Sequence, residues 1–379
     1  MKMLKKATIL LSHIPNPRML KRIKAVENDF NVVLIYWDRG QLENETFEIN
    51  HNHKVLKVSI KAPQGKPIKK LIPLVRYMFN VLAKLKNEKP DIVHAGNLDM
   101  LMIAAIYQKH FNKKTKIIYE VADLPKYSFI KKANSPKTIL AKLLQSLEKK
   151  LTSRVSKIIL TSPYFWEEYF SKFIKLDKYL FIPNSPSKKL FSKYVKKKHD
   201  NFTIGYIGSV RYIEQLKMLI DVVEEMDKNI KVLIAGSGPG YSEIKEYSKD
   251  KKFVEVYGPY NYEEEIVRLY EKVDCTYAVY NTKLNNVKIA LPNRLYESIV
   301  CEIPIIGTKN TELGSFIEQN QIGININEDK QELKEALIML KNSSELNNLY
   351  QKNCNKIKSD YYYEKDSERL LNEYIKLTS

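Results

Sequence analysis

The stretch of sequence that decides the fold runs from Asn285 to Ile306 and reads NNVKIALPNRLYESIVCEIPII. Pro292 fits the first turn of a helix, where its missing N–H costs nothing. Leu295, Ile299 and Val300 then recur at i, i+4 and i+5 and form an apolar stripe, and the apolar end of the stretch predicts a short buried strand. The stretch therefore predicts a loop that feeds a helix, followed by a core strand.

The N-terminus of this predicted helix suits a negatively charged ligand. Its free N–H groups and the positive end of the helix dipole favour an anion such as a diphosphate. Lys288 and Arg294 flank this terminus, and Glu297 lies one turn into the helix. A carboxylate in that place can accept two hydrogen bonds from the vicinal diol of a ribose. The same residues also fit an amphipathic helix and a core strand without any ligand.

The stretch resembles the donor-site signature of the group 1 glycosyltransferases of GT-B architecture, which in one subset reads roughly Lys-x-x-Leu-Pro-Asn-Lys-Leu-Phe-Glu-Tyr. The matching positions are Lys288, Leu291, Pro292, Asn293, Arg294, Leu295, Tyr296 and Glu297. Relatives usually carry two glutamates eight positions apart, and the first would fall at Ile289. The resemblance implies that Glu297 is the ribose ligand, and it leaves the role of the first glutamate open.

Glycines that follow predicted strands carry the rest of the expected donor site. Such glycines let the backbone approach a phosphate and supply N–H donors, although a lone Gly-x-Gly can equally be a turn. The donor-binding positions expected here are Gly208, Ser209, Gly236, Gly238, Tyr257 and Gly258. The resemblance places the last three of these at the nucleotide base.

A cationic clamp is expected to take the place of a metal ion. Gly208-Ser209-Val210-Arg211 resembles the family's Gly-Ser-Leu-Arg, whose arginine stabilises the leaving diphosphate, and the family's partner lysine falls at Glu214. We expect Arg211, with Lys288 and Arg294, to neutralise the diphosphate. The sequence has no Asp-x-Asp pair to suggest a divalent ion, so no metal site is expected.

A second group of candidates follows a buried strand in the first half of the chain. Asp123 comes just after this strand, where polar residues line the crevice of an open α/β sheet, and Glu120 is the next acidic candidate. We therefore expect Asp123 to be catalytic, with a helix or turn cap as the alternative. Relatives often carry a histidine where Ala122 stands, so its role is absent or falls to another group, such as His94 or Asp99.

The chain as a whole shows two successive series of strands and helices, each with five or six strands. Two such series predict an α/β protein with two Rossmann-like domains, whose parallel sheets face one another across a cleft in the GT-B manner. The resemblance implies that residues 1–190 bind the acceptor and 191–359 bind the nucleotide-sugar donor, with 360–379 as a helix that crosses back to the first domain. No glycine run completes the Gly-x-Gly-x-x-Gly of a dehydrogenase.

Composition narrows the class of protein. The 379 residues are 44% hydrophobic and 28% charged, which is typical of globular domains. No run of eighteen apolar residues is present, and the apolar start lacks a small-residue cleavage site. Three scattered cysteines suit reduced thiols. We expect a cytoplasmic protein with neither a transmembrane helix nor a signal peptide.

The net charge of +19 is unevenly distributed. Residues 1–190 hold 36 lysines and arginines against 15 acidic residues, whereas the rest of the chain holds 27 against 29. This excess predicts that the first half docks on an anionic membrane surface, at the inner face of the plasma membrane, through basic helices at 68–86 and 126–157. The leucine stripe of 140–151 can instead face the domain core. No aromatic-basic motif indicates nucleic-acid binding.

The resemblance also implies an activity. It implies a hexosyltransferase that retains the anomeric configuration, needs no metal or cofactor, and uses a UDP- or GDP-sugar as co-substrate. The acceptor would be a glycan or a lipid-linked sugar in bacterial surface polysaccharide synthesis. A nucleotide-sugar epimerase on the same fold and a non-catalytic partner in a glycan assembly complex are the alternatives. The sequence leaves the sugar, the acceptor and the oligomeric state open.

Overall fold

The computed structural model describes residues 4–40, 53–62, 71–226 and 229–379. The chain divides into two compact units, the first holding Met1–Pro183 with Asp366–Ser379 and the second holding Asn184–Lys365. The expected divisions at 190 and 360 differ from these by a few residues, and the last helix, α15 (Tyr363–Thr378), contributes residues to both units. No helix within the described ranges is long and apolar enough to cross a membrane.

The first unit is built on a seven-stranded parallel sheet in the order β3-β2-β1-β4-β5-β6-β7. The strands are β1 (Lys6–Leu11), β2 (Asn31–Asp38), β3 (Lys54–Ser59), β4 (Ile92–Gly96), β5 (Lys116–Val121), β6 (Lys157–Leu160) and β7 (Tyr179–Phe181). The central strands are nearly continuous apolar runs because both faces of the sheet are covered. The strand order turns back between β1 and β4, and an open sheet binds ligands beyond the carboxyl ends at such a point.

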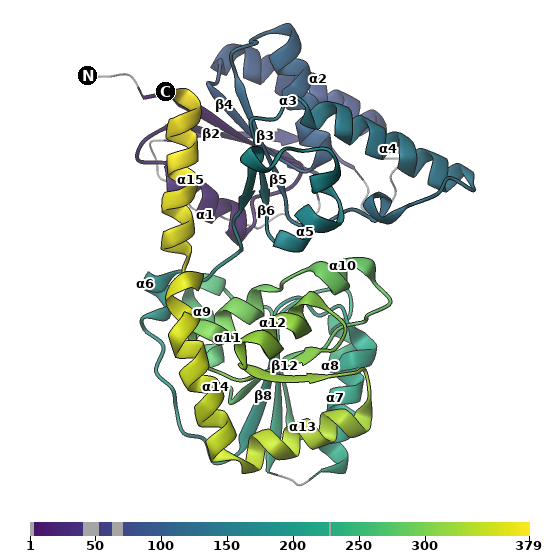
Figure 1. Cartoon of the computed structure of the whole chain (residues 1–379), viewed down its shortest axis with the longest axis vertical. Helices are drawn as coiled ribbons and strands as arrows, with labels where there is room; N and C mark the ends of the chain where they lie inside the picture. Colours follow the sequence, from purple (N-terminus) through teal and green to yellow (C-terminus); the bar gives the residue numbers. More distant parts are fainter. Residues whose placement is uncertain (1–3, 41–52, 63–70, 227–228) are drawn as a thin grey trace. The chain divides into compact units, whose positions relative to one another are not determined.

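Helices cover both faces of this sheet. They are α1 (Pro17–Val26), α2 (Leu71–Glu88), α3 (Leu98–His110), α4 (Pro136–Thr152) and α5 (Pro163–Glu168). Figure 1 shows α2, α3 and α4 on one side of the sheet and α1 with the end of α15 on the other. α1 starts where its sequence favours a start, since Asn16 accepts from the Met19 N–H at 3.0 Å and Pro17 takes the first turn. The expected start of α2 at Ile68 lies outside the described residues.

α4 turns a carboxylate, and not its first leucines, toward the sheet. Glu148 is fully buried and accepts hydrogen bonds from the Tyr119 hydroxyl at 2.6 Å and the Tyr169 hydroxyl at 2.8 Å. Leu140 and Leu143 are 58% and 62% exposed. The alternative in which the leucine stripe faces the core is therefore wrong for the first half of this helix.

The second unit is built on a six-stranded parallel sheet in the order β10-β9-β8-β11-β12-β13. The strands are β8 (Phe202–Ile207), β9 (Ile230–Ala235), β10 (Val254–Gly258), β11 (Cys275–Ala278), β12 (Ile305–Thr308) and β13 (Gly323–Ile326). The order turns back between β8 and β11, which makes the loops that follow these two strands the centre of the expected ligand edge.

Two hydrophobic cores hold the helices of the second unit on this sheet. The helices are α6 (Lys188–Phe191), α7 (Ile213–Glu225), α8 (Tyr241–Tyr247), α9 (Tyr262–Tyr270), α10 (Asn285–Ile289), α11 (Asn293–Val300), α12 (Glu312–Asn320), α13 (Lys330–Asn342) and α14 (Ser344–Ile357). One core takes its side chains from α7, α12 and α13, the other from α6 and α9, and α11 contributes to both. The predicted fold class, α/β with two parallel Rossmann-like sheets, is confirmed.

Candidate functional site

The candidate donor site lies at the carboxyl edge of the second sheet. Gly208 follows β8, Gly236 follows β9, and Gly258 ends β10, so these three glycines meet at one edge. The Gly208 N–H donates to the Ala235 carbonyl at 2.8 Å, and the Gly236 N–H donates to the Gly258 carbonyl at 2.7 Å. These two N–H groups are already bonded to the ends of neighbouring strands. They hold the backbone segments close together and are not the N–H donors expected for a phosphate.

The closeness of the loops explains why glycine stands at these places. Gly208, Gly236 and Gly238 all have positive φ values, of 132°, 136° and 150°. A Cβ on Gly236 would come within 1.9 Å of the Gly208 carbonyl oxygen, and a Cβ on Gly238 would come within 2.6 Å of the Val210 carbonyl oxygen. Any larger residue would push the loops apart. The result is a bare backbone surface at the strand ends, suited to a flat or phosphate-bearing ligand.

Arg294 lies beneath this surface. Its side chain is buried, with the guanidinium carbon 3.8 Å from the centre of the Tyr206 ring and Nη1 donating to the Tyr277 carbonyl at 3.1 Å. Its Nη2 would lie 2.9 Å from a Cβ on Gly208. Arg294 therefore places a positive charge next to the first glycine loop on its buried side. Because the side chain is buried, water and salt screen this charge little.

Glu297 is held by two tyrosines of α9. The carboxylate is buried, and it accepts from the Tyr262 hydroxyl at 2.8 Å and from the Tyr270 hydroxyl at 2.9 Å. Burial and the adjacent carboxylate raise the pKa of both hydroxyls, which stay protonated donors. These two bonds fix the orientation of the carboxylate.

These two tyrosines were not identified from the sequence as partners of Glu297. Tyr262, Ile266 and Tyr270 stand at i, i+4 and i+8 and so share one face of α9. That spacing was available in the sequence. It is also the ordinary pattern of a core-facing helix, and the pairing with Glu297 depends on a contact between residues far apart in the chain.

Arg211 and Lys288 are exposed side chains near the same edge. Arg211 follows the first glycine loop, and its Nε donates to the Ser209 hydroxyl at 3.3 Å. Lys288 stands on α10 and lines a cavity of about 350 Å³ together with Lys309 and Asn310. Neither cation is buried, so each can move toward an anionic ligand.

The remaining donor candidates lie around the start of α11 and the end of β10. α11 begins at the exposed Asn293, and Pro292 is its N-cap residue, one position before the first turn in which it was expected. Leu291 is partly buried against the first core, and Leu295 is fully buried. Tyr257 is 39% exposed and donates its hydroxyl hydrogen bond to Glu265. Leu295 is thus a packing residue, while the exposed Asn293 and Tyr257 can reach a ligand.

The candidates of the first unit separate into a surface residue and a buried cluster. Asp123 is exposed, just beyond β5. Glu120, at the end of the same strand, is buried and forms ion pairs with Arg18 at 3.1 Å and Arg22 at 3.3 Å. His94 is also fully buried. We expected that Glu120 or His94 could act on a substrate, but burial excludes both from direct contact, and Asp123 remains the exposed candidate.

The buried cluster joins the first sheet to the last helix. Glu120 Oε2 lies 3.0 Å from His94 Nε2, and His94 Nδ1 lies 2.7 Å from the hydroxyl of Tyr374 on α15. Burial alone would raise the pKa of the Glu120 carboxyl, but Arg22, His94 and Arg18 outweigh it and hold that pKa far below its usual range. The role of this cluster is structural, because it fixes α15 to the sheet.

Comparison with known proteins agrees with the resemblance of the second unit. Residues 201–343 match the family model described as "Glycosyl transferases group 1". A curated relative, the succinoglycan biosynthesis protein ExoL of Rhizobium meliloti (strain 1021), is 26% identical over 249 residues. The match covers 62% of this chain and 60% of ExoL, so the aligned part spans less than two thirds of that relative. The predicted resemblance to group 1 glycosyltransferases is confirmed.

Solved structures share the fold over almost the whole chain. Anabaena Alr3699/HepE in complex with UDP superposes with a TM-score of 0.71 at 14% identity, covering 98% of this chain and 100% of HepE. WaaG, a glycosyltransferase involved in lipopolysaccharide biosynthesis, gives a TM-score of 0.68 at 12% identity, covering 97% and 99%. These likenesses confirm the GT-B fold. The family match favours a transferase over the epimerase and the non-catalytic partner.

Proposed function

We propose that this chain transfers a sugar from a nucleotide-sugar donor to a glycan or lipid-linked acceptor in bacterial surface polysaccharide synthesis, because residues 201–343 match the group 1 glycosyltransferase model. The observation that carries the proposal is the edge of the second sheet, where an oriented carboxylate and a bare glycine surface lie together. The donor is a UDP- or GDP-sugar, and the UDP in the HepE complex supports the first of these. Glu297 binds the ribose diol, while Gly238, Tyr257 and Gly258 surround the base.

In this reaction the bond between the anomeric carbon and the diphosphate breaks, and a bond to an acceptor hydroxyl forms. Arg211 and Lys288 neutralise the charge that develops on the diphosphate, and Arg294 adds to the field from beneath. The departing phosphate oxygen takes the proton of the acceptor hydroxyl on the same face, so the anomeric configuration is retained. Asp123 in the first unit orients the acceptor hydroxyl by accepting a hydrogen bond from it.

The activity itself is tested by incubating the full chain with a panel of UDP- and GDP-sugars and membrane-derived acceptor lipids. We expect acceptor-dependent release of the nucleoside diphosphate together with a glycosylated lipid, at a rate unchanged by EDTA. Release without any joined sugar, or conversion of one nucleotide sugar into another, would contradict the proposal. Loss of activity in EDTA would contradict only its metal-independent form.

Replacement of Glu297 by glutamine is expected to weaken the binding of UDP by about 10- to 100-fold, because a charge-assisted bond to the ribose is lost. Glutamine keeps the side-chain size and one acceptor for the α9 tyrosines. The effect should fall on donor KM, with kcat nearly unchanged at saturating donor. Calorimetric titration with UDP measures it, and Glu264→Gln, at an exposed glutamate of α9, is the control.

We further propose that the first unit associates with the inner face of the membrane. The exposed leucines of α4 lie among lysines, and an amphipathic helix of this kind can place apolar side chains at the headgroup boundary while lysines meet anionic lipid. The buried Glu148 supports this orientation, since it keeps the opposite side of α4 on the sheet. A lipid-linked acceptor would require such access to the bilayer.

Charge reversal on α4 and the segment before it should weaken vesicle binding by at least about a hundredfold at low salt, because each basic group near an anionic surface contributes severalfold. The lysines to be changed to glutamate are Lys131, Lys132, Lys149 and Lys150, all exposed. Co-sedimentation with anionic vesicles measures the loss, and UDP affinity should stay constant.

The control for this prediction reverses four exposed lysines of the second unit. They are Lys245, Lys249, Lys252 and Lys352. Equal losses in both variants would show that net charge alone drives binding, and a parallel fall in UDP affinity would place the α4 lysines at the donor site.

A further inference from the structure

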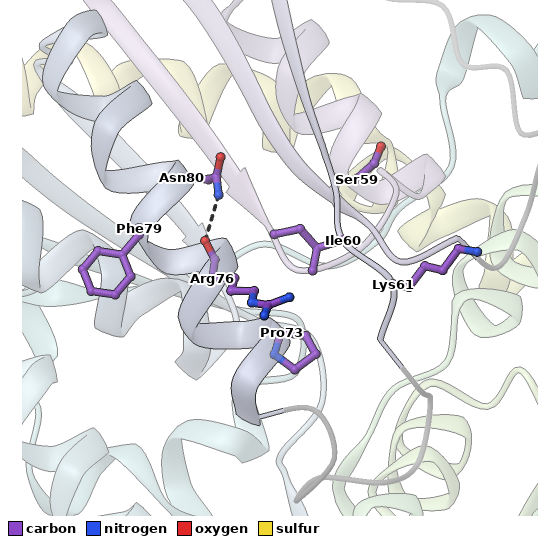
Figure 2. A pocket seen from close by; sticks show the side chains of 7 residues that line it. All are labelled: Ser59, Ile60, Lys61, Pro73, Arg76, Phe79 and Asn80. Atoms are coloured by element: carbon purple, nitrogen blue, oxygen red, sulfur yellow. Dashed lines mark hydrogen bonds between the residues drawn. The ribbon is translucent and has the colours of Figure 1, made fainter.

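A second depression lies in the first unit, between the end of β3 and the start of α2. We call it the β3–α2 pocket; its volume is about 610 Å³ (Figure 2). Its polar lining residues are Ser59, Lys61, Arg76 and Asn80. Its apolar lining comes from Ile60, Pro73 and Phe79. In Figure 2 the Arg76 guanidinium lies between α2 and the Ile60 side chain, while Lys61 leaves the chain at the far rim.

The charge of this pocket is positive. Among the described residues that line it, two are cations and none is acidic. The acidic side chain bonded to the lining is Asp38, which accepts from the Ser59 hydroxyl at 3.1 Å and is already paired with Lys57 at 2.8 Å. Arg76 is exposed at the pocket, and a guanidinium can bind two oxygens of one phosphate group. The pocket therefore suits a phosphate.

The helix that lines the pocket, α2, also carries exposed apolar side chains, which a soluble phosphate would not require. Leu71, Ile72, Val75 and Phe79 stand at i, i+1, i+4 and i+8 on α2, and all four are exposed, Phe79 by 63%. They form one stripe on the helix that also carries Arg76. A surface with an exposed apolar stripe beside a cationic pocket matches the boundary between acyl chains and headgroups of a bilayer.

We propose that the β3–α2 pocket binds the phosphate group of a membrane lipid, with Arg76 as its direct ligand and Lys61 at the rim. The α2 stripe then enters the acyl layer beside the bound headgroup. The inference rests on the proposed function and deepens it, since a transferase that acts on a lipid-linked acceptor must work at the bilayer. It names a phosphate-bearing lipid, bound at one defined place, as the partner of the first unit.

The test uses the full chain and vesicles of two compositions. One is phosphatidylcholine with about 10% phosphatidic acid, and the other carries oleate to the same surface charge. Wild-type protein should prefer the phosphatidic acid vesicles. Arg76→Glu combined with Lys61→Glu should weaken that binding by at least about 25-fold, since each basic group near an anionic surface contributes about fivefold. Flotation of protein with vesicles measures both results.

Two matched controls separate the pocket from general charge and general apolarity. Lys113→Glu with Lys114→Glu makes the same charge change at exposed lysines just before β5, at the amino edge of the sheet, and should cost less than about twofold. Phe79→Ser should weaken vesicle binding, whereas Phe111→Ser, at a phenylalanine that is 49% exposed after α3, should not.

Three results would contradict the proposal that the β3–α2 pocket binds a lipid phosphate. They are equal losses in the two charge variants, equal binding of the wild type to phosphate and carboxylate vesicles, and thermal stabilisation by inorganic phosphate without vesicle binding. Each variant must keep the wild-type melting temperature and UDP affinity. If the wild type binds lipid as expected but neither binds UDP nor transfers a sugar, the proposed transferase function is contradicted, while the proposed lipid site is supported.

Discussion

Replacing Arg211 by alanine is expected to lower kcat by about two to three orders of magnitude, with a small effect on donor affinity. The reason lies in the timing of charge: the diphosphate becomes more negative as the bond to the sugar breaks, so a cation that contacts it stabilises the transition state more than the bound donor. Arg211 is exposed beside the first glycine loop and is bound only to the Ser209 hydroxyl among the contacts of the described residues, so it can turn to a ligand.

The exposure of Arg211 also means that its removal should not disturb the fold. Steady-state kinetics at saturating donor measure the effect, and calorimetric titration with UDP shows that binding persists. Arg154→Ala, which removes an exposed arginine just before β6, is the control for lost charge. A folded Arg211→Ala variant with wild-type kcat would remove Arg211 from the site.

Replacing Glu120 by glutamine is expected to destabilise the first unit by about 3–5 kcal/mol, because it leaves the buried Arg22 and the partly buried Arg18 without their counter-charge. Arg22 is 1% exposed and also donates to the Ile182 carbonyl at 2.9 Å, so it cannot turn to water. Both tryptophans, Trp37 and Trp166, stand in the first unit, so tryptophan fluorescence during urea unfolding reports on this unit alone. Glu167→Gln, at an exposed position, should change little.

The same carboxylate gives the first unit a pH dependence of defined sign. The pKa of Glu120 is lower in the folded state than in the unfolded state, where it returns to the ordinary glutamate value of about 4.5. Its contribution is therefore complete above that value and is lost as the pH falls below it. The urea midpoint of the wild type should fall in this acidic range more steeply than that of Glu120→Gln. Parallel curves would contradict this account.

The local features of the second unit were the most predictable from sequence. The start of α11 at Pro292-Asn293 and the glycines after β8, β9 and β10 follow from rules that act over a few residues. The sequence also predicted Glu297 as the ribose ligand through a spaced motif, and this stays a prediction. It did not indicate that Tyr262 and Tyr270 hold this carboxylate, because that contact joins residues separated by 35 and 27 positions.

Side-chain orientation in the first unit was less predictable. Glu120 and His94 are polar residues in places where a ligand is expected, and both are buried. A charged residue at a strand end can contact either a substrate or a partner inside the protein, and only the folded neighbours decide between the two. The leucines of α4 raised the converse problem, since an apolar stripe ordinarily faces the core. In the structure Glu148 faces the sheet instead, because its carboxylate accepts hydrogen bonds from two tyrosines that are distant in the sequence.

The return of α15 to the first sheet has a consequence for synthesis on the ribosome. Tyr374 closes the His94 cluster across 280 positions of sequence, whereas the second unit is one continuous segment, Asn184–Lys365. During translation the second unit can therefore complete its fold while the first still waits for residues 366–379. Nascent chains stalled beyond Lys365 should be cut by protease within residues 1–183 and be spared within 184–365, and equal protection of both would contradict this order. The first unit would then be synthesised first but completed last. Until α15 emerges, the buried charged residues of the first unit would remain partly exposed to water.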